Sequence, residues 1–210
     1  MNNIKAIIFD FDDTLALSSE EVVRAIEHTA QICDLPCPER EAIIEMFGRP
    51  LRLIVETFWP FANPEEFVEV YNGVYQIHNV RLIEKAKEVL EQLSLASFEL
   101  HILTSRRRES LIKHLEQFAI KGLFKSLIAY EDVEYHKPDP RAFSVFFEKY
   151  KPNEVVYVGD SVYDMHAAKQ AGIFFIGVCT GIVTREGFEL KKADVILDSV
   201  AQLRNSFFTN

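Results

Sequence analysis

The chain has 210 residues, 48% of them hydrophobic and 26% charged, which are ordinary values for a globular protein of one large domain or a domain with an insertion. Its net charge of −9 argues against nucleic acid and against an anionic membrane as partners, because no basic surface is available to neutralise phosphates. The run Arg106–Arg108 is short, and we interpret Arg107 and Arg108 as exposed residues in the first turn of a helix.

The sequence also favours a cytoplasmic protein. No apolar stretch approaches the roughly 20 residues that span a bilayer, and the segment from Met1 to Lys5 lacks the pattern of a signal peptide. Cys33, Cys37 and Cys179 form no C-x-x-C motif, so we expect reduced thiols. Nothing in the sequence specifies an oligomeric state.

The first predicted element is a strand that ends in acidic residues. The apolar run Ala6–Phe9 is followed directly by Asp10, Asp12 and Asp13, which indicates a buried strand of a parallel sheet. Ligands of such sheets lie beyond the carboxyl ends of the strands. Two adjacent carboxylates repel each other unless a cation lies between them, and hard oxygen ligands suit Mg²⁺. At this point a solvated acidic turn remains the alternative.

A long helical segment follows. Ser18–Glu21 has the pattern of a capping box, and helices are predicted to begin near residues 19, 39, 51 and 64, with Asn63-Pro64 as a cap. No strand pattern occurs between Leu15 and about Val80. We interpret residues 16–80 as an inserted helical cap domain and residues 1–15 and 81–210 as the core domain. Phe58, Trp59 and Phe61 are interpreted as the core of the cap, and a cap aromatic that faces the substrate is the alternative.

Strands and helices then alternate. Helices are expected over 82–93, 111–118, from Pro140 through Phe147, over 162–171 and from Ser199 onward, and strands over 98–103, 127–129, 155–158, 174–178 and 195–197. This alternation predicts an α/β fold with a Rossmann-like, doubly wound parallel sheet.

Polar residues follow several of these strands. Asp10 and Asp12 come after the first, Thr104 after the second, and Asp160 and Asp164 after the strand over 155–158, whereas Lys137 lies in a preceding loop. Because strand ends of a parallel sheet face one crevice, we expect these groups to meet there. Carboxylates that hold Mg²⁺, together with a lysine and a hydroxyl, could neutralise a phosphate and allow a carboxylate to attack it.

These motifs, in this order, resemble the four motifs of the haloacid dehalogenase superfamily of phosphohydrolases. The resemblance covers essentially the whole chain and is strongest to phosphoglycolate phosphatase-like members with a helical cap. It rests on Asp10–Thr14, the strand ending at Thr104, Lys137–Pro140 and Gly159–Asp164.

The resemblance implies a role for each matching residue. Asp10 would be the nucleophile that forms an aspartyl-phosphate, and Asp12 the general acid and base. Both would contact Mg²⁺, Asp12 through its backbone carbonyl. Thr104 and Lys137 would bind the phosphoryl oxygens, and Lys137 would also restrain Asp10. Asp160 would bind Mg²⁺ directly, and Asp164 would support the metal through Asp160, a water or Lys137.

A few positions depart from the family pattern or have open roles. Asp13 stands where relatives often have glycine, and we interpret it as a solvated loop acid. Ser105 follows the motif threonine where asparagine is frequent and could share its role in substrate binding. Arg49 lies in a cap loop that reaches over the active site in relatives, so it is either a contact to a substrate anion or an exposed turn residue. Arg106 has the same two interpretations.

The sequence therefore predicts a Mg²⁺-dependent phosphatase that hydrolyses a small phosphorylated metabolite similar to phosphoglycolate. A phosphomutase similar to β-phosphoglucomutase and an inorganic pyrophosphatase are the alternatives within the superfamily. A receiver-like signalling module also gathers acids, a hydroxyl and a lysine around Mg²⁺, but it lacks an inserted cap.

Overall fold

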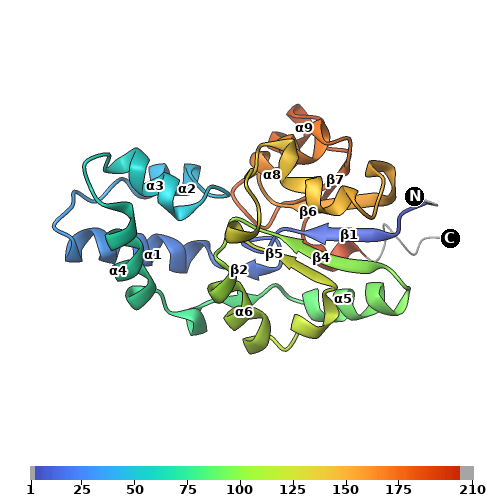
Figure 1. Ribbon diagram of the computed structural model, residues 1–210, viewed down its shortest axis with the longest axis horizontal. Coiled ribbons are helices and arrows are strands. Elements are labelled where there is room, and N and C mark those ends of the chain that lie inside the picture. Colours follow the sequence, from blue (N-terminus) through green and yellow to red (C-terminus); the bar gives the residue numbers. More distant parts are fainter. Residues whose placement is uncertain (1–2, 204–210) are drawn as a thin grey trace.

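The centre of the molecule is a six-stranded parallel sheet with the strand order β5-β4-β1-β6-β7-β8 (Figure 1). The computed structural model describes residues 3–203. The strands are β1 (Ala6–Phe9), β4 (Glu99–Leu103), β5 (Ser126–Ile128), β6 (Val155–Gly159), β7 (Phe174–Val178) and β8 (Val195–Leu197). β1 lies between β4 and β6, where a wholly apolar strand has both faces covered. The predicted α/β fold is confirmed.

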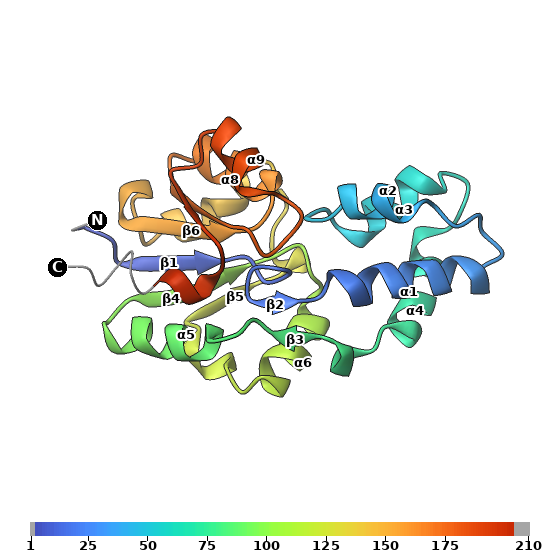
Figure 2. The same ribbon diagram turned by 180° about the vertical axis from the view of Figure 1, so that it is seen from behind.

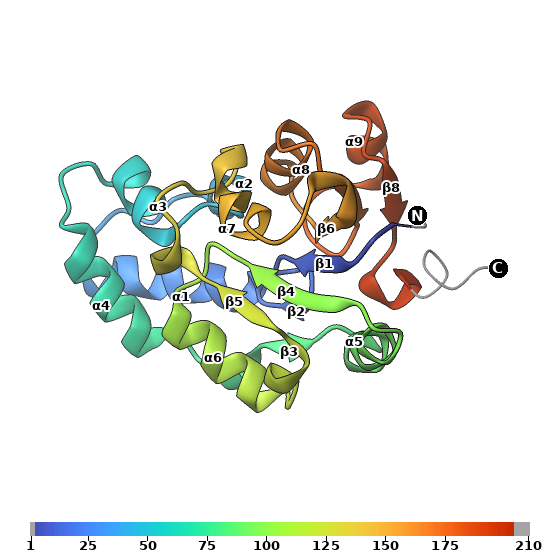
Figure 3. The ribbon, with the colours of Figure 1, turned by 45° about the vertical axis from the view of Figure 1, so that its right-hand side comes forward.

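Helices cover both faces of the sheet, because successive side chains of a strand point to opposite sides. Ile7 and Phe9 pack on one side with α5 (Ala86–Leu95) and α6 (Arg108–Gln117). Ala6 and Ile8 pack on the other side, where α7 (Ser144–Phe147), α8 (Val162–Gln170) and α9 (Arg185–Leu190) lie. Figure 3 shows these two layers on either side of the sheet. The result is a three-layer core.

Short 3₁₀ helices complete the core. They are η2 (Lys121–Leu123), η3 (Tyr130–Asp132), η4 (Pro140–Phe143), η5 (Pro152–Glu154) and η6 (Val200–Gln202). The helix predicted after Pro140 is thus a 3₁₀ turn that continues into α7. The helix predicted from Ser199 begins as η6, with the Ser199 hydroxyl accepting a hydrogen bond from the Ala201 N–H, and its remainder lies outside the described residues.

A block of four helices projects from one end of the sheet, as Figure 2 shows from behind. These are α1 (Ser19–Ile32), α2 (Arg40–Glu45), α3 (Leu51–Phe58) and α4 (Pro64–Val74). They have their own apolar core, in which Trp59 is 1% exposed and donates its indole N–H to the Pro36 carbonyl at 2.9 Å. Placing Phe61 in this core was wrong, because its side chain is 73% exposed.

A small sheet joins the helical block to the core. β2 (Ala16–Leu17) and β3 (Arg81–Leu82) pair antiparallel, and a short 3₁₀ helix, η1 (Ile77–Asn79), precedes β3. The expectation of no strand between Leu15 and about Val80 was wrong, because β2 lies in that segment. Strands of two residues carry no alternating pattern that a sequence could reveal. Their pairing brings together the two chain segments that enter and leave the block.

Among residues 3–203, no helix combines the length and the apolar character needed to cross a membrane.

Candidate functional site

Asp10 lies directly beyond the carboxyl end of β1. Its backbone N–H donates to the Val158 carbonyl at 2.9 Å, which continues the ladder between the two central strands. The residue is 4% exposed, and its carboxylate accepts a hydrogen bond of 2.7 Å from Lys137 Nζ. Burial raises the pKa of Asp10 to about 7, Lys137 opposes this effect, and the neighbouring Asp164 and Asp12 add to it.

Lys137 is held by three acceptors. Its ammonium group donates to Asp10 Oδ1 at 2.7 Å, to Asp164 Oδ1 at 2.6 Å and to the Tyr157 hydroxyl at 3.0 Å. Burial by itself would lower the pKa of Lys137, but Asp10 and Asp164 outweigh it and raise that pKa. All the hydrogens of the ammonium group therefore have acceptors, and the lysine stays charged beside Asp10.

Asp164, in the first turn of α8, has both carboxylate oxygens in hydrogen bonds. Oδ1 accepts from Lys137 and from Tyr157 Oη at 2.8 Å, and Oδ2 accepts from the Ser161 N–H at 3.1 Å and the Ser161 hydroxyl at 2.5 Å. A Cβ at Gly159 would lie 2.6 Å from Asp164 Cγ, so this packing requires glycine there. Of the routes predicted for Asp164, which were Asp160, a water or Lys137, these contacts favour support through Lys137.

Asp160 follows β6 and lies next to the same acids. It is 6% exposed and accepts a hydrogen bond from the Thr14 hydroxyl at 3.2 Å. A Cβ at Gly181 would lie only 1.9 Å from Asp160 Oδ2, so the loop after β7 can approach this close only with glycine. Burial raises the pKa of Asp160 well above its usual value, and Asp164, Asp10 and Asp13 raise it further.

The chemistry of this donor set fits a divalent cation. Asp10, Asp160 and Asp164 each offer a carboxylate oxygen, and these oxygens lie within 4.8 Å of one another. Of the cations in residues 3–203, Lys137 is the one that forms ion pairs with this group. The acids thus carry more negative charge than the lysine neutralises, and Mg²⁺ prefers oxygen ligands of this kind.

Asp12 points to the other side of the site, where it meets Arg106. Arg106 Nε lies 3.1 Å from both carboxylate oxygens, Nη2 also donates to Oδ1, and the Ser18 hydroxyl donates to Oδ1 at 2.6 Å. Burial would raise the pKa of Asp12, but Arg106 outweighs it and lowers that pKa. Of the two interpretations of Arg106, exposure is excluded, because its side chain is 8% exposed.

Interpreting Asp13 as a solvated acid was wrong. The residue is 5% exposed, with a φ of 51°, and its carboxylate accepts from the backbone N–H groups of Ser18 at 3.0 Å and Ser19 at 3.2 Å. Asp13 therefore caps the start of α1, whereas the Ser18 side chain, predicted to do so, bonds Asp12 instead. Burial raises the pKa of Asp13 to about 6, and these two N–H groups oppose the rise.

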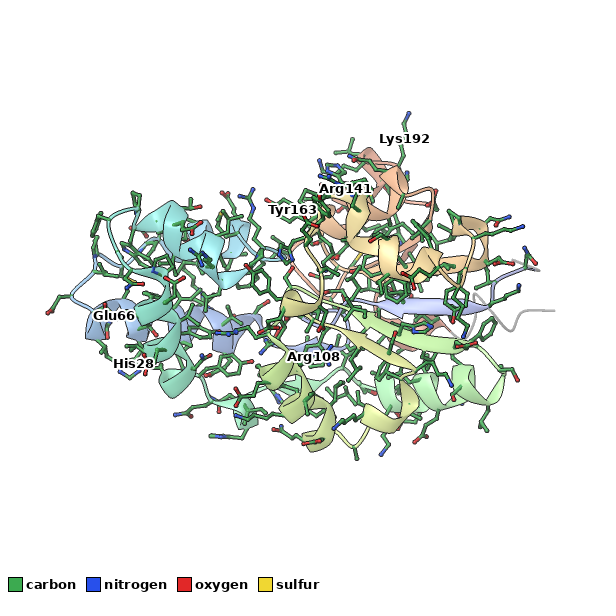
Figure 4. The ribbon with its side chains drawn as sticks, in the orientation of Figure 1. His28, Glu66, Arg108, Arg141, Tyr163 and Lys192 are labelled. Carbon is green, nitrogen blue, oxygen red and sulfur yellow. The ribbon has the colours of Figure 1, made fainter. Side chains whose placement is uncertain are left out.

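Three more predicted site residues lie near these acids, namely Thr104, Ser105 and Arg49. Thr104 follows β4, is buried, and its Oγ1 accepts from the Arg106 N–H at 3.2 Å. The Ser105 hydroxyl donates to the Gly48 carbonyl at 2.8 Å. Arg49 Nε donates to the Tyr163 hydroxyl at 2.8 Å, and its guanidinium lies 4.9 Å from that ring centre. Tyr163 is labelled in Figure 4 near the start of α8. Both contacts join the loop between α2 and α3 to the core.

A cavity of about 530 Å³ lies between the strand ends and the helical block. Its core wall includes Asp10, Asp12, Thr104, Arg106 and Asp160. Its other wall comes from the helical block and combines apolar residues, Val22, Phe47, Leu51, Ile54, Val68 and Tyr71, with polar and charged ones, Arg49, Arg52, Glu65, Glu69 and Asn72. Among the predicted site residues, Lys137 and Asp164 do not line the cavity and lie behind Asp10.

Two residues of the site were not predicted from the sequence as they are found. Tyr157 was not identified at all, and Arg106 was left as either a contact to a substrate anion or an exposed residue. Tyr157 is a fully buried residue of β6 whose hydroxyl contacts Lys137 and Asp164. The sequence did contain a signal for Tyr157, because it is the one phenol in the otherwise aliphatic strand β6. A buried hydroxyl needs a hydrogen-bond partner, which would have indicated a polar group nearby. Arg107 and Arg108 were interpreted correctly as residues at the start of a helix. They pair with Glu131 and Asp132, and Arg108 is labelled in Figure 4.

Comparison with known proteins agrees with the geometry. Residues 7–178 match the family model of the haloacid dehalogenase-like hydrolases. The pyrophosphatase PpaX of Anoxybacillus flavithermus is 29% identical over 206 residues, which cover 96% of this chain and 95% of that protein.

Two solved structures share the fold. One is a haloacid dehalogenase-like family protein, SP0104 of Streptococcus pneumoniae, with a TM-score of 0.84, 23% identity and coverage of 99% of this chain and 100% of that one. The other is CbbY of Rhodobacter sphaeroides in complex with phosphate, with a TM-score of 0.83, 22% identity and coverage of 95% and 96%. The chain belongs to the haloacid dehalogenase-like hydrolase family and is an enzyme of that hydrolase class.

Proposed function

We propose that the protein is a Mg²⁺-dependent phosphatase that transfers the phosphoryl group of a small phosphorylated molecule to Asp10 and then to water. The observation that carries this proposal is the position of Asp10. It lines the cavity at the end of the central strand, and its carboxylate is fixed from behind by Lys137 and flanked by Asp160. A nucleophile held in one orientation beside cationic groups is what phosphoryl transfer requires.

The proposed reaction has two steps. An Asp10 oxygen bonds to phosphorus while the bond from phosphorus to the leaving oxygen breaks. Asp12 must be protonated for this step, against the effect of Arg106 on its pKa, and donates that proton to the leaving oxygen. Asp12 then takes a proton from a water whose oxygen bonds to phosphorus, and the bond from Asp10 to phosphorus breaks to release phosphate. Mg²⁺, held by Asp10, the Asp12 carbonyl and Asp160, would neutralise charge on the phosphoryl oxygens. Thr104 would bind one of those oxygens.

We further propose that residues 16–80 act as a cap. The Ser105–Gly48 and Arg49–Tyr163 contacts, opposite the β2–β3 connection, support this role. Their opening would admit substrate, and their closure would exclude bulk water during the transfer. The cavity volume of about 530 Å³ supports a substrate small enough to be enclosed. We expect the enzyme to work in the cytoplasm.

The preferred substrate is a phosphate monoester similar to phosphoglycolate. Pyrophosphate is the second candidate, and it is favoured by the relative named pyrophosphatase PpaX, which aligns over nearly the whole chain. Both have a small leaving group that carries negative charge.

The test is phosphate release from 2-phosphoglycolate, pyrophosphate, p-nitrophenyl phosphate and a sugar phosphate, with Mg²⁺ and with EDTA. Asp10→Asn should lower the rate by roughly 10³-fold or more, because it removes the nucleophile. Asp198→Asn is the matched control, since that carboxylate is 69% exposed and pairs with Arg185. Acid-quenched wild type should contain a phosphorylated Asp10 peptide.

Equal activity of Asp10→Asn and wild type would contradict the mechanism. Isomerisation of the sugar phosphate without phosphate release would identify a phosphomutase instead.

A further inference from the structure

Arg106 is a buried cation in the wall of the cavity. It comes from the loop after β4, and Asp12 and Ser110 hold its guanidinium, with Nη1 donating to the Ser110 hydroxyl at 2.9 Å. The guanidinium also lies over two aromatic rings, 5.6 Å from the centre of Phe11 and 5.2 Å from that of Tyr75. Its position is therefore fixed from several sides.

Arg106 offsets part of the negative charge around the cavity. Asp10, Asp12, Asp13 and Asp160 line the inner end, and an anionic substrate would be repelled there unless cations compensate. Lys137 compensates on the side of Asp10, where the phosphoryl group would bind. Arg106 compensates on the side of Asp12, where the leaving group would lie.

The other arginines that line the cavity have partners other than the proposed catalytic carboxylates. Arg52 and Arg107 have side chains that are 53% and 56% exposed, and they pair with surface glutamates. Arg49 donates to the Tyr163 hydroxyl of α8. Among the described residues, Arg106 is thus the cavity arginine that contacts a proposed catalytic carboxylate.

We propose that Arg106 determines specificity by binding a negative charge on the leaving group, so that the substrates are phosphate compounds with a carboxylate or a second phosphate close to the scissile oxygen. This inference rests on the proposed function. The guanidinium lies against the carboxylate that would meet the leaving oxygen. Asp12 and Ser110 accept three of its five N–H groups, and the remaining N–H groups on Nη1 and Nη2 could donate to carboxylate or phosphate oxygens. A neutral leaving group of the same size would make no charged contact with it and would be selected against.

The experiment compares two substrates of nearly equal shape. 2-Phosphoglycolate has an anionic leaving group, and 2-hydroxyethyl phosphate has a neutral one. Wild type, Arg106→Gln, Arg106→Lys and the control Arg185→Gln are assayed with Mg²⁺, after circular dichroism has shown that each is folded. Arg185 pairs with Asp198 on the surface and takes no part in the cavity.

Wild type and Arg185→Gln should prefer 2-phosphoglycolate by roughly 10- to 100-fold in kcat/KM, the range expected for a hydrogen bond to a charged group. Arg106→Gln should lose most of that preference, mainly through a higher KM for 2-phosphoglycolate, and Arg106→Lys should keep part of it. Calorimetry on the Asp10→Asn protein, with and without Arg106→Gln, should give the same change in the ratio of the two dissociation constants.

Two results would overturn the inference. One is an equal loss on both substrates in Arg106→Gln, which would mean that Arg106 only orients Asp12. The other is a wild type that binds and hydrolyses both substrates equally well. Failure of the proposed function gives a different result: wild type would release no phosphate from either substrate, while calorimetry would still measure whether Arg106 favours the anionic ligand.

Discussion

Replacing Tyr157 with phenylalanine tests whether the groups behind Asp10 hold it in place. The Tyr157 hydroxyl accepts from Lys137 Nζ at 3.0 Å and lies 2.8 Å from Asp164 Oδ1 and 3.1 Å from the Leu103 carbonyl, both of which can accept its proton. The substitution removes one oxygen atom and leaves the ring in place. An N–H group of Lys137, whose side chain is 3% exposed, then loses its acceptor.

The size of the effect follows from these contacts. A hydrogen bond to a charged group contributes about 1.5–3 kcal/mol, and a buried donor left without a partner costs a similar amount. We therefore expect Tyr157→Phe to lower the free energy of unfolding by about 2–3 kcal/mol. The freed ammonium group would shift relative to Asp10, and a small misplacement of the nucleophile should lower kcat by roughly 10-fold.

Tyr150→Phe is the matched control. Tyr150 is also buried, and its hydroxyl lies 3.0 Å from Nε2 of His101, away from the cavity. Its other polar neighbours, Lys149 and Glu99, have side chains that are 54% and 36% exposed. We expect a loss of about 1 kcal/mol and an unchanged kcat. Urea denaturation and steady-state kinetics measure both quantities. If the two variants had the same kcat, or if Tyr157→Phe cost less than about 0.5 kcal/mol, the hydroxyl would not be restraining Lys137.

Two further predictions concern the metal and pH. Gly181→Ala would place a Cβ 1.9 Å from Asp160 Oδ2, so we expect Mg²⁺ binding measured by calorimetry to weaken by roughly 10- to 100-fold. Gly122→Ala, which has no atom within 4 Å of the added Cβ, should bind as wild type does, and unchanged binding in both variants would contradict the assignment of Asp160. Burial, with Arg106 adding to it, lowers the pKa of His114 to about 4 from 6.5. The unfolded chain therefore takes up this proton first, and stability should fall by up to about 3 kcal/mol as the pH drops from about 6.5 to 4. Urea denaturation of His114→Gln should show a weaker pH dependence than that of wild type, and identical dependence would refute the argument.

The start of α1 illustrates how a local pattern can mislead. Ser18–Glu21 has the spacing of a capping box, yet the Ser18 hydroxyl bonds Asp12 and the Asp13 carboxylate caps the helix. The strand that precedes this turn and the helix that follows it fix the chain so that Asp13 points back at the first N–H groups. Its φ of 51° is a property of this turn, which explains why glycine could also occupy the position.

The sequence by itself determined the order of the elements and the residues at the strand ends. Apolar runs such as Ala6–Phe9 are local patterns, and in a parallel sheet the residue after each run must lie at one common edge. For that reason the sequence is sufficient to predict that Asp10, Asp12, Thr104 and Asp160 lie together. The short strands β2 and β3 could not be predicted, because their pairing joins segments separated by the whole helical block.

Tertiary structure alone decided which partner each of these groups has. A carboxylate's partner depends on distances between loops that are far apart in sequence, and no spacing along the chain encodes them. In the folded chain Lys137 pairs with Asp10 and Asp164, and Arg106 pairs with Asp12. The Tyr157 hydroxyl accepts a hydrogen bond from Lys137. In a buried site every charge needs a counter-charge or a hydrogen bond, and these pairings give the acids of one short motif different environments.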